Sequence, residues 1–171
     1  MPLLETPRLQ LRWLSADDGP FILALLNEPS FIRNIGDRGV RTLDAARDYI
    51  EAGPMASYAR HGFGLYLVEL TAMRTAIGIC GILKRDELPE PDLGFAFLPG
   101  YWSQGYARES AAAVKDYARD VLRMARLLAI VNPANFSSIR LLEKLGFALT
   151  SVTQLTPDAA TVNLYTCKLT P

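Results

Sequence analysis

The stretch from Leu93 to Arg108 combines residue types that bind phosphate, because a strand, a glycine-bearing turn and a helix start follow one another there. The bulky residues Leu93, Phe95 and Phe97 alternate with much smaller ones, so one face of the predicted strand is almost bare and can hold a ligand. Gly105 opens a helix whose first turn leaves backbone N–H groups unpaired and carries positive dipole potential. The segment therefore predicts an anion site that needs no lysine.

Three phosphate-binding patterns compete for this turn. A nucleoside-triphosphate loop needs Lys and then Ser or Thr after its second glycine, but Tyr106 and Ala107 follow Gly105. A dinucleotide loop needs three glycines after a strand, and Gly62-Phe-Gly64 precedes its strand and lacks the third. The last part of a third pattern, Gln/Arg-x-x-Gly-x-Gly/Ala, is matched by Trp102-Ser-Gln-Gly-Tyr-Ala. The third pattern is the one that the residues favour.

Few other side chains predict chemistry. Cys80 and Cys167 are single cysteines in strand-like apolar runs, without partners at metal-ligand spacing. We expect both to be reduced core residues, and we expect no metal site. His61 is the only histidine, the residue type that titrates nearest neutrality, but it lies in a predicted surface loop.

The composition favours one domain over residues 1–171. Half of the 171 residues are hydrophobic, which suffices for one good core and not for two. Lys plus Arg and Asp plus Glu number 18 each, so the net charge is zero and gives no reason to expect a nucleic-acid partner. The amino terminus lacks a basic segment followed by an apolar run, and no apolar stretch reaches membrane-spanning length. We expect a cytoplasmic protein without a membrane partner.

Hydrophobic periodicity predicts the elements that position the turn. Strands are expected over residues 8–14, 64–70, 76–83, 93–97, 126–131, 148–155 and 161–169. Helices are expected from Ser15 to near Pro29, from Thr42 to about Tyr58, from Gly105 through Val121, and from the Asn132–Ser138 cap to Gly146. This order predicts a mixed α/β (α+β) domain with a central sheet of about six to seven strands and helices on both faces.

Three segments carry a resemblance to a known family. They are Thr6-Pro-Arg-Leu-Gln-Leu-Arg, Asp92-Leu-Gly-Phe with the following Pro-Gly-Tyr-Trp-Ser-Gln-Gly-Tyr-Ala, and Asn135-Phe-Ser-Ser-Ile-Arg-Leu-Leu-Glu-Lys-Leu-Gly-Phe. In this order and at these separations they resemble the GNAT superfamily of acetyl-CoA-dependent N-acetyltransferases. Within it the chain is most similar to the branch of ribosomal-protein N-terminal (Rim-type) acetyltransferases. Trp102 stands where the pattern often has Gln or Arg, which looks familiar for this branch.

The resemblance implies a fold in which two strands, here 93–98 and 127–131, splay apart and acetyl-CoA fills the gap. The pyrophosphate of coenzyme A would lie on the N–H groups of the turn, and its pantetheine arm would pair with the first strand. Arg140 would either meet a cofactor phosphate or be an exposed helix residue. The cofactor-binding residues implied in this way are Phe95, Ala96, Phe97, Trp102, Ser103, Gln104, Gly105, Tyr106, Ala107, Asn135 and Ser138.

The resemblance also implies direct attack of a neutral amine on the thioester. Many family members protonate the departing thiolate with a tyrosine on the last helix, but Leu142 occupies that position here. Ser138, or an ordered water, is then the candidate acid, although Ser138 is equally well explained as a helix cap. Asp92 and Glu69 are candidate bases, and each can also be read as a solvated or capping carboxylate.

The implied acceptor is a primary amine, either a small molecule or a protein N-terminus. By analogy with the family, residues 31–58 would hold it, with Phe31 to Ile35 and Met55 to Tyr58 as an aromatic and apolar wall. A monomer and a homodimer are both compatible with the sequence. The alternative function is a non-catalytic domain that binds acyl-CoA as a sensor or regulator.

Overall fold

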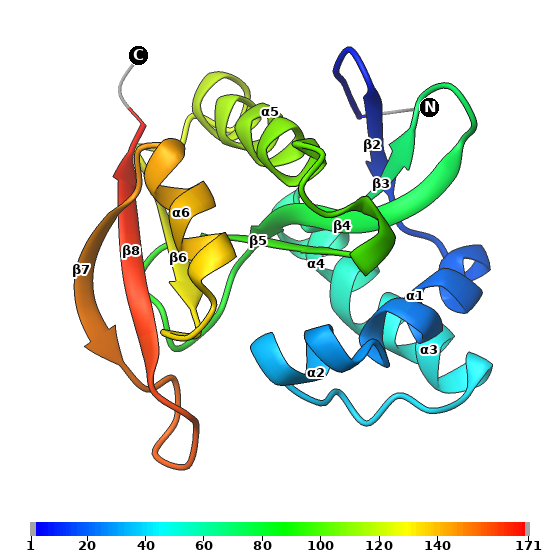
Figure 1. Cartoon of the computed structure of the whole chain (residues 1–171), viewed down its shortest axis with the longest axis horizontal. Coiled ribbons are helices and arrows are strands. Elements are labelled where there is room, and N and C mark those ends of the chain that lie inside the picture. Colours follow the sequence, from blue (N-terminus) through cyan, green and yellow to red (C-terminus); the bar gives the residue numbers. More distant parts are fainter. Residues whose placement is uncertain (1–2, 170–171) are drawn as a thin grey trace.

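The computed structural model describes residues 3–169, whose strands form one eight-stranded sheet in the order β1-β2-β3-β4-β5-β6-β8-β7 (Figure 1). The strands are β1 (Leu4–Glu5), β2 (Leu9–Trp13), β3 (Leu65–Leu70), β4 (Thr75–Leu83), β5 (Asp92–Phe97), β6 (Arg126–Val131), β7 (Ala148–Thr153) and β8 (Val162–Lys168). The helices are α1 (Gly19–Leu26), α2 (Pro29–Asn34), α3 (Leu43–Ile50), α4 (Ala56–His61), α5 (Tyr106–Asp120) and α6 (Phe136–Lys144).

The mixed α/β architecture is confirmed. Neighbouring strands are antiparallel except β5 and β6, which are parallel and are connected through α5. The sheet has eight strands rather than the expected six to seven. The strand that the sequence did not reveal is β1, whose two residues are too few to show an alternating pattern. Its pairing is nonetheless regular, with Leu4 opposite Leu11 and Glu5 opposite Gln10.

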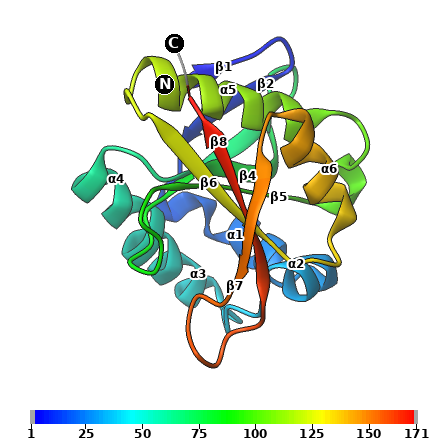
Figure 2. The ribbon, with the colours of Figure 1, turned by 90° about the vertical axis from the view of Figure 1, so that its left-hand side faces the viewer.

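The parallel strands β5 and β6 splay apart as expected. They share a single register pair, Asp92 with Leu128, at the beginning of β5. Beyond that pair the two strands diverge toward their carboxyl ends, and Figure 2 shows β6, β7 and β8 crossing in front of β4 and β5. The edge of β5 is therefore left without a ladder partner along most of its length.

Helices cover both faces of the sheet because each central strand is apolar on both sides. On β3, Tyr66 and Val68 belong to the core under α5, whereas Leu67 belongs to the core shared with α1 and α3. On β4, Cys80 and Ile79 divide in the same way. This alternation fixes the register of the central strands, since a slip of one residue would exchange the two cores.

Two predicted helical segments differ in detail. The first ends at Leu26, near Pro29 as expected, but Pro29 begins a further helix that was not predicted, α2, after an extended residue at Glu28. The second is continuous from α3 to α4, but Pro54 lies inside it and the turn Glu51–Met55 is π-helical. A proline cannot donate the N–H that a regular α-turn needs there, and the wider turn accommodates this.

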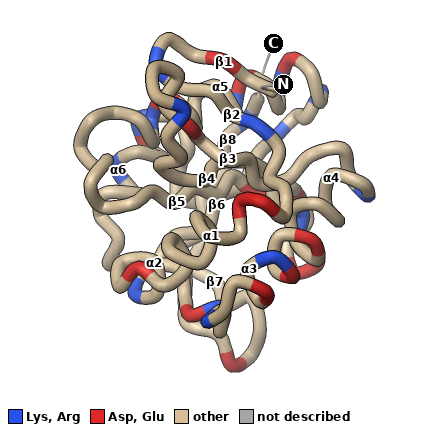
Figure 3. Tube along the Cα trace, turned by 90° about the vertical axis from the view of Figure 1, so that its right-hand side faces the viewer, with Lys and Arg blue, Asp and Glu red and all other residues tan. Residues whose placement is uncertain are grey.

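Acidic and basic residues are interspersed over the surface in Figure 3. In the described range of 3–169, no helix has the length and hydropathy of a membrane span, and no group of His, Cys, Asp and Glu could hold a metal ion. Cys80 and Cys167 are buried and free, as expected of core residues. Burial raises the pKa of Cys80 to about 12, so its thiol stays protonated at neutral pH.

Candidate active site

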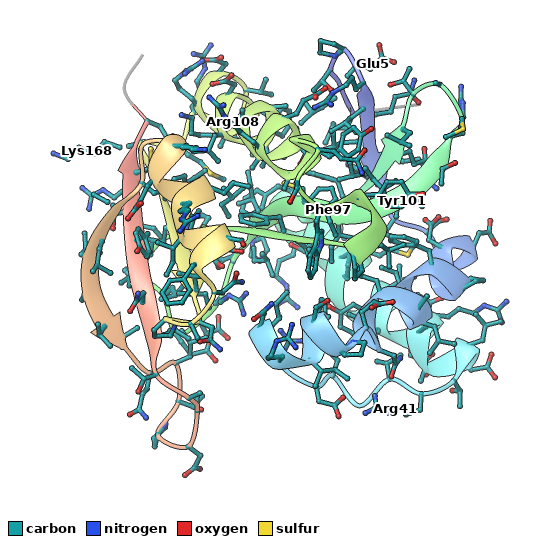
Figure 4. The ribbon with its side chains drawn as sticks, in the orientation of Figure 1. Glu5, Arg41, Phe97, Tyr101, Arg108 and Lys168 are labelled. Carbon is teal, nitrogen blue, oxygen red and sulfur yellow. The ribbon has the colours of Figure 1, made fainter. Side chains whose placement is uncertain are left out.

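A cavity of about 750 Å³ opens where β5 and β6 diverge. Its walls come from the end of β5, the turn before α5, the beginning of α5, the helix α6 and, on another side, α2. Figure 4 labels Phe97 at the end of β5, Tyr101 beside the turn and Arg108 on α5. Every residue expected to bind the cofactor lines the cavity except Gln104: these are Phe95, Ala96, Phe97, Trp102, Ser103, Gly105, Tyr106, Ala107, Asn135 and Ser138.

The turn before α5 presents a row of unpaired backbone N–H groups. Ser103 and Gly105 have φ angles of +59° and +84°, which turn successive N–H groups toward the same side. Within residues 3–169, the N–H groups from Ser103 to Arg108 donate to no protein acceptor. The N–H of Trp102 donates to the carbonyl of Pro99 at 3.2 Å, so this donor, unlike the others of the turn, is already used within the protein.

Arg8, just before β2, holds this turn in place. Its guanidinium donates to the carbonyl oxygen of Gln104 at 2.9 Å, forms an ion pair with Glu109 at 2.6 Å, and lies 4.5 Å from the centre of the Tyr106 ring. Burial raises the pKa of Glu109, but hydrogen bonds from Thr6 and Arg8 outweigh burial and lower it below its ordinary value. The sequence showed the motif that contains Thr6 and Arg8 but not this positioning role, because the residues lie about 100 positions from the turn.

The edge of β5 offers hydrogen-bonding groups to the cavity. The Leu98 N–H donates to the carbonyl oxygen of Ile77 on β4. Because successive N–H groups of a strand point to opposite edges, the N–H groups of Phe97 and Phe95 point away from β4 and toward the gap. The almost bare strand face is open to the cavity only in part. A Cβ on Gly94 would lie 2.6 Å from the side chain of Leu83, which already fills that space. Ala96, farther along the same face, lines the cavity.

The beginning of α6 places Ser138 in the cavity. The side-chain oxygen of Asn135 accepts a hydrogen bond from the Ser138 N–H at 3.3 Å, so Asn135 is the helix cap. The Ser138 hydroxyl has no partner among the described residues and is free to meet a ligand. Leu142, which stands where many relatives have tyrosine, is 1% exposed and belongs to the core.

Three cations on α5 and α6 line the cavity: Arg108, Arg140 and Lys144. Within the part of the chain that the structure describes, none of them forms an ion pair. Arg108 lies in the first turn of α5, where the helix dipole disfavours a positive charge. Arg140 and Lys144 are one turn apart on α6. A bound polyanion would balance all three charges.

Neither carboxylate expected as a base lines the cavity. Asp92 is 1% exposed and accepts a hydrogen bond from the Arg85 Nε atom at 3.0 Å. Burial raises the pKa of Asp92, and the nearby charge of Arg85 opposes that rise. Glu69 is 8% exposed. It lies on β3 and forms an ion pair at 3.0 Å with Arg12 on the neighbouring strand β2, away from the gap between β5 and β6. Each carboxylate is engaged by an arginine away from the gap, so the geometry does not support either as the base.

The predicted acceptor wall is only partly present. Ser30, Phe31, Arg33 and Asn34 of α2, and Ile35 directly after it, line the cavity. Tyr58 does not line the cavity because it is buried, where its hydroxyl accepts the N–H of Leu14 at 3.1 Å. Met55 also lies outside the cavity and is exposed. Of the two predicted segments, only the one at α2 faces the cavity.

Similarity to known proteins agrees with this geometry. The family model described as the acetyltransferase (GNAT) domain matches residues 8–148. An uncharacterized N-acetyltransferase, YoaA of Bacillus subtilis strain 168, is 27% identical over 148 residues, covering 85% of this chain and 82% of YoaA.

Two solved structures show the same fold. The acetyltransferase from Agrobacterium tumefaciens strain C58 is 27% identical, with a TM-score of 0.79 and coverage of 97% of this chain and 94% of that one. RimL, a ribosomal L7/L12 α-N-protein acetyltransferase solved in complex with coenzyme A, is 17% identical, with a TM-score of 0.82 and coverage of 99% and 98%. The family match spans most of the chain and includes both the glycine turn and the cap of α6. This chain belongs to the GNAT family of acetyltransferases.

Proposed function

We propose that this protein transfers the acetyl group of acetyl-CoA to a primary amine by direct attack. The observation that carries the proposal is the turn before α5, where unpaired N–H groups from Ser103 to Arg108 face a cavity that is also lined by three cations without ion pairs on α5 and α6. Coenzyme A carries several phosphate groups, which can accept hydrogen bonds from these N–H groups and pair with the cations. The similar fold of RimL was solved with coenzyme A.

The residues present fit the phosphates and the amide-containing arm of this group. Gly105 and Ala107 are small, so the main chain can approach a pyrophosphate closely. Arg108, Arg140 and Lys144 supply positive charge for phosphates. The edge of β5 has free N–H groups for an amide-containing arm, in the manner of an added strand.

Acetyl-CoA supplies the thioester carbonyl carbon that an amine attacks. Backbone N–H groups of Phe95 and Phe97 are placed to stabilise the negative charge that develops on the carbonyl oxygen, and one such donor is commonly worth about 3 kcal/mol. No Asp or Glu lines the cavity in the described residues, so the amine enters as the neutral base. Ser138, free at its hydroxyl, is our candidate for delivering a proton to the departing sulfur.

Release of free thiol tests this function. We expect the protein, mixed with acetyl-CoA and a panel of primary amines, to release coenzyme A thiol only when a suitable amine is present. The rate should rise with pH as each amine loses its proton, in the order of the amines' own pKa values. Saturable cofactor binding without amine-dependent thiol release would favour a sensor of acyl-CoA instead, and no binding of acetyl-CoA would contradict both functions.

Replacing Ser138 with alanine should lower kcat about 10-fold or more, in line with the loss of a general acid, while coenzyme A affinity changes little. The substitution removes only the hydroxyl, because the cap uses the backbone N–H of Ser138 and the Asn135 side chain. Steady-state kinetics checks this, with Ser137→Ala as the matched control on the same cavity wall. Equal kcat values for the two variants would instead favour an ordered water as the acid.

A further inference from the structure

We propose that the acceptor amine carries a carboxylate and that Arg33 on α2 binds it. This inference rests on the proposed acetyl transfer and adds to it the chemical class of the acceptor. The carboxylate has two natural sources: a free amino acid, or an acidic side chain next to a protein N-terminus. The chemistry at Arg33 is the same for both.

The position of Arg33 separates it from the cations of the phosphate side. Arg108, Arg140 and Lys144 come from α5 and α6, whereas Arg33 lines the cavity from α2. Figure 1 shows α2 below the gap between β5 and β6, and α5 above it. At the end of α2 the Arg33 carbonyl lies 3.5 Å from the side-chain nitrogen of Asn132, in the loop after β6. Arg33 therefore lies on the α2 wall of the cavity, away from the cations of α5 and α6.

Arg33 has no ion-pair partner among the described residues, which is also true of Arg38, Arg60, Arg74 and Arg123 outside the cavity. Among residues 3–169, the arginines with a carboxylate partner are Arg8, Arg12, Arg41, Arg47, Arg85, Arg119 and Arg126. None of these lines the cavity, and none of the arginines that line it has a partner. Phosphates of coenzyme A can balance the charges of the cations on α5 and α6. The α2 residues that line the cavity include no carboxylate that could balance the charge of Arg33.

The charge of the lining selects against cationic acceptors. No Asp or Glu in the described chain lines the cavity, so a polyamine or an aminoglycoside would add positive charge without a counter-ion. A carboxylate matches the planar fork of a guanidinium and can form two parallel hydrogen bonds with it. Ser30 and Asn34 on the same helix, and Ile35 directly after it, also line the cavity near Arg33.

Matched acceptor pairs test the proposal. One pair is a tripeptide amide with glutamate at its second position and the same peptide with glutamine there. The other pair is alanine and alaninamide. Because their amino groups differ in pKa, each rate is divided by the fraction of the amine that is neutral at the assay pH. We expect kcat/KM to be at least about 10-fold higher for the carboxylate member of one pair, as a charge-assisted hydrogen bond implies. The pair that shows the preference identifies the source of the carboxylate.

The variants Arg33→Gln, Arg33→Lys and Arg38→Gln complete the test. Arg33→Gln should reduce the preference to about 1, Arg33→Lys should restore part of it, and Arg38→Gln, an exposed arginine outside the cavity, should retain it. Calorimetric titration with coenzyme A shows whether each variant still binds the cofactor with unchanged affinity.

Each failure has a distinct signature. Equal rates for both members of both pairs, a preference that survives in Arg33→Gln, or a polyamine as the best acceptor would overturn the proposal while acetyl transfer stands. If no amine is acetylated although coenzyme A binds, the proposed function itself is wrong.

Discussion

Replacing Gly105 with glutamate is expected to weaken coenzyme A binding by about 100-fold or more. The residue caps α5 at the centre of the unpaired N–H groups, so a carboxylate there would occupy the phosphate position and repel a phosphate by like charge. Loss of two charge-assisted hydrogen bonds, at about 1.5–3 kcal/mol each, already exceeds a factor of 100. Calorimetric titration with coenzyme A measures the change.

Gly105→Ala is the matched control for backbone strain. At φ +84° any side chain strains the backbone, at a cost of about 1–2 kcal/mol that both variants share. Space is not the obstacle, since a Cβ there would meet only the end of the Arg8 side chain, at 3.2 Å. Thermal unfolding should therefore give similar Tm values for the two variants. If Gly105→Glu binds coenzyme A as tightly as Gly105→Ala, the phosphate does not lie on this turn.

Replacing Arg85 with methionine is expected to lower the free energy of unfolding by about 3 kcal/mol at pH 7, the usual cost of leaving a buried charge without its partner. The Arg85–Asp92 pair lies at the vertex of the gap, because Asp92 is the residue of β5 that pairs with Leu128 of β6. Asp92 is almost fully buried, whereas Arg85 keeps part of its side chain in water. Urea unfolding measures the loss.

The loss should shrink as the pH falls. Burial raises the pKa of Asp92 above its unfolded value of about 3.9, and removal of Arg85 raises it further. A carboxyl with a raised folded pKa takes up its proton first in the native state, so its destabilising effect is full above the folded pKa and is lost as the pH falls through it toward the unfolded pKa. Unfolding at pH 5 and pH 7 should therefore show a smaller deficit at pH 5.

A double variant separates charge from packing. Arg85→Met combined with Asp92→Asn removes both charges, and most of the lost stability should return. If the double variant is as unstable as Arg85→Met alone, the loss comes from packing of the arginine stem against the loop before β5. The pair would then have no electrostatic role at the vertex of the gap.

The Gly105 turn, the long helix after it and the strands on either side were predictable from the sequence because their signals are local. A glycine at a left-handed position, alternating residues from Leu93 to Phe97 and an apolar stripe on α5 each depend on neighbours a few positions away. The same local signals found the Asn135 cap of α6. The cofactor-binding residues predicted from these segments, except Gln104, accordingly fall together in one cavity.

The charged side chains could not be placed in this way. Asp92 and Glu69 looked like bases because they stand near the cofactor strand or on a neighbouring one, but each folds onto an arginine that no local pattern connects with it. The role of Arg8 depends on contacts with Gln104 and Glu109, far along the chain. Arg33 reaches the cavity only because α2 packs below the splayed strands.

By itself, then, the sequence determined that a strand, a glycine turn and a helix follow one another and leave backbone N–H groups unpaired, since backbone conformation follows from neighbouring residues. Tertiary structure alone decided which charges surround that turn. Ion pairs such as Arg85–Asp92 keep carboxylates out of the gap, and where β5 and β6 diverge α2 lines the cavity with an arginine that has no ion pair. The physical reason is that the electrostatic complement of a charge depends on distance in space, which only the packed chain defines.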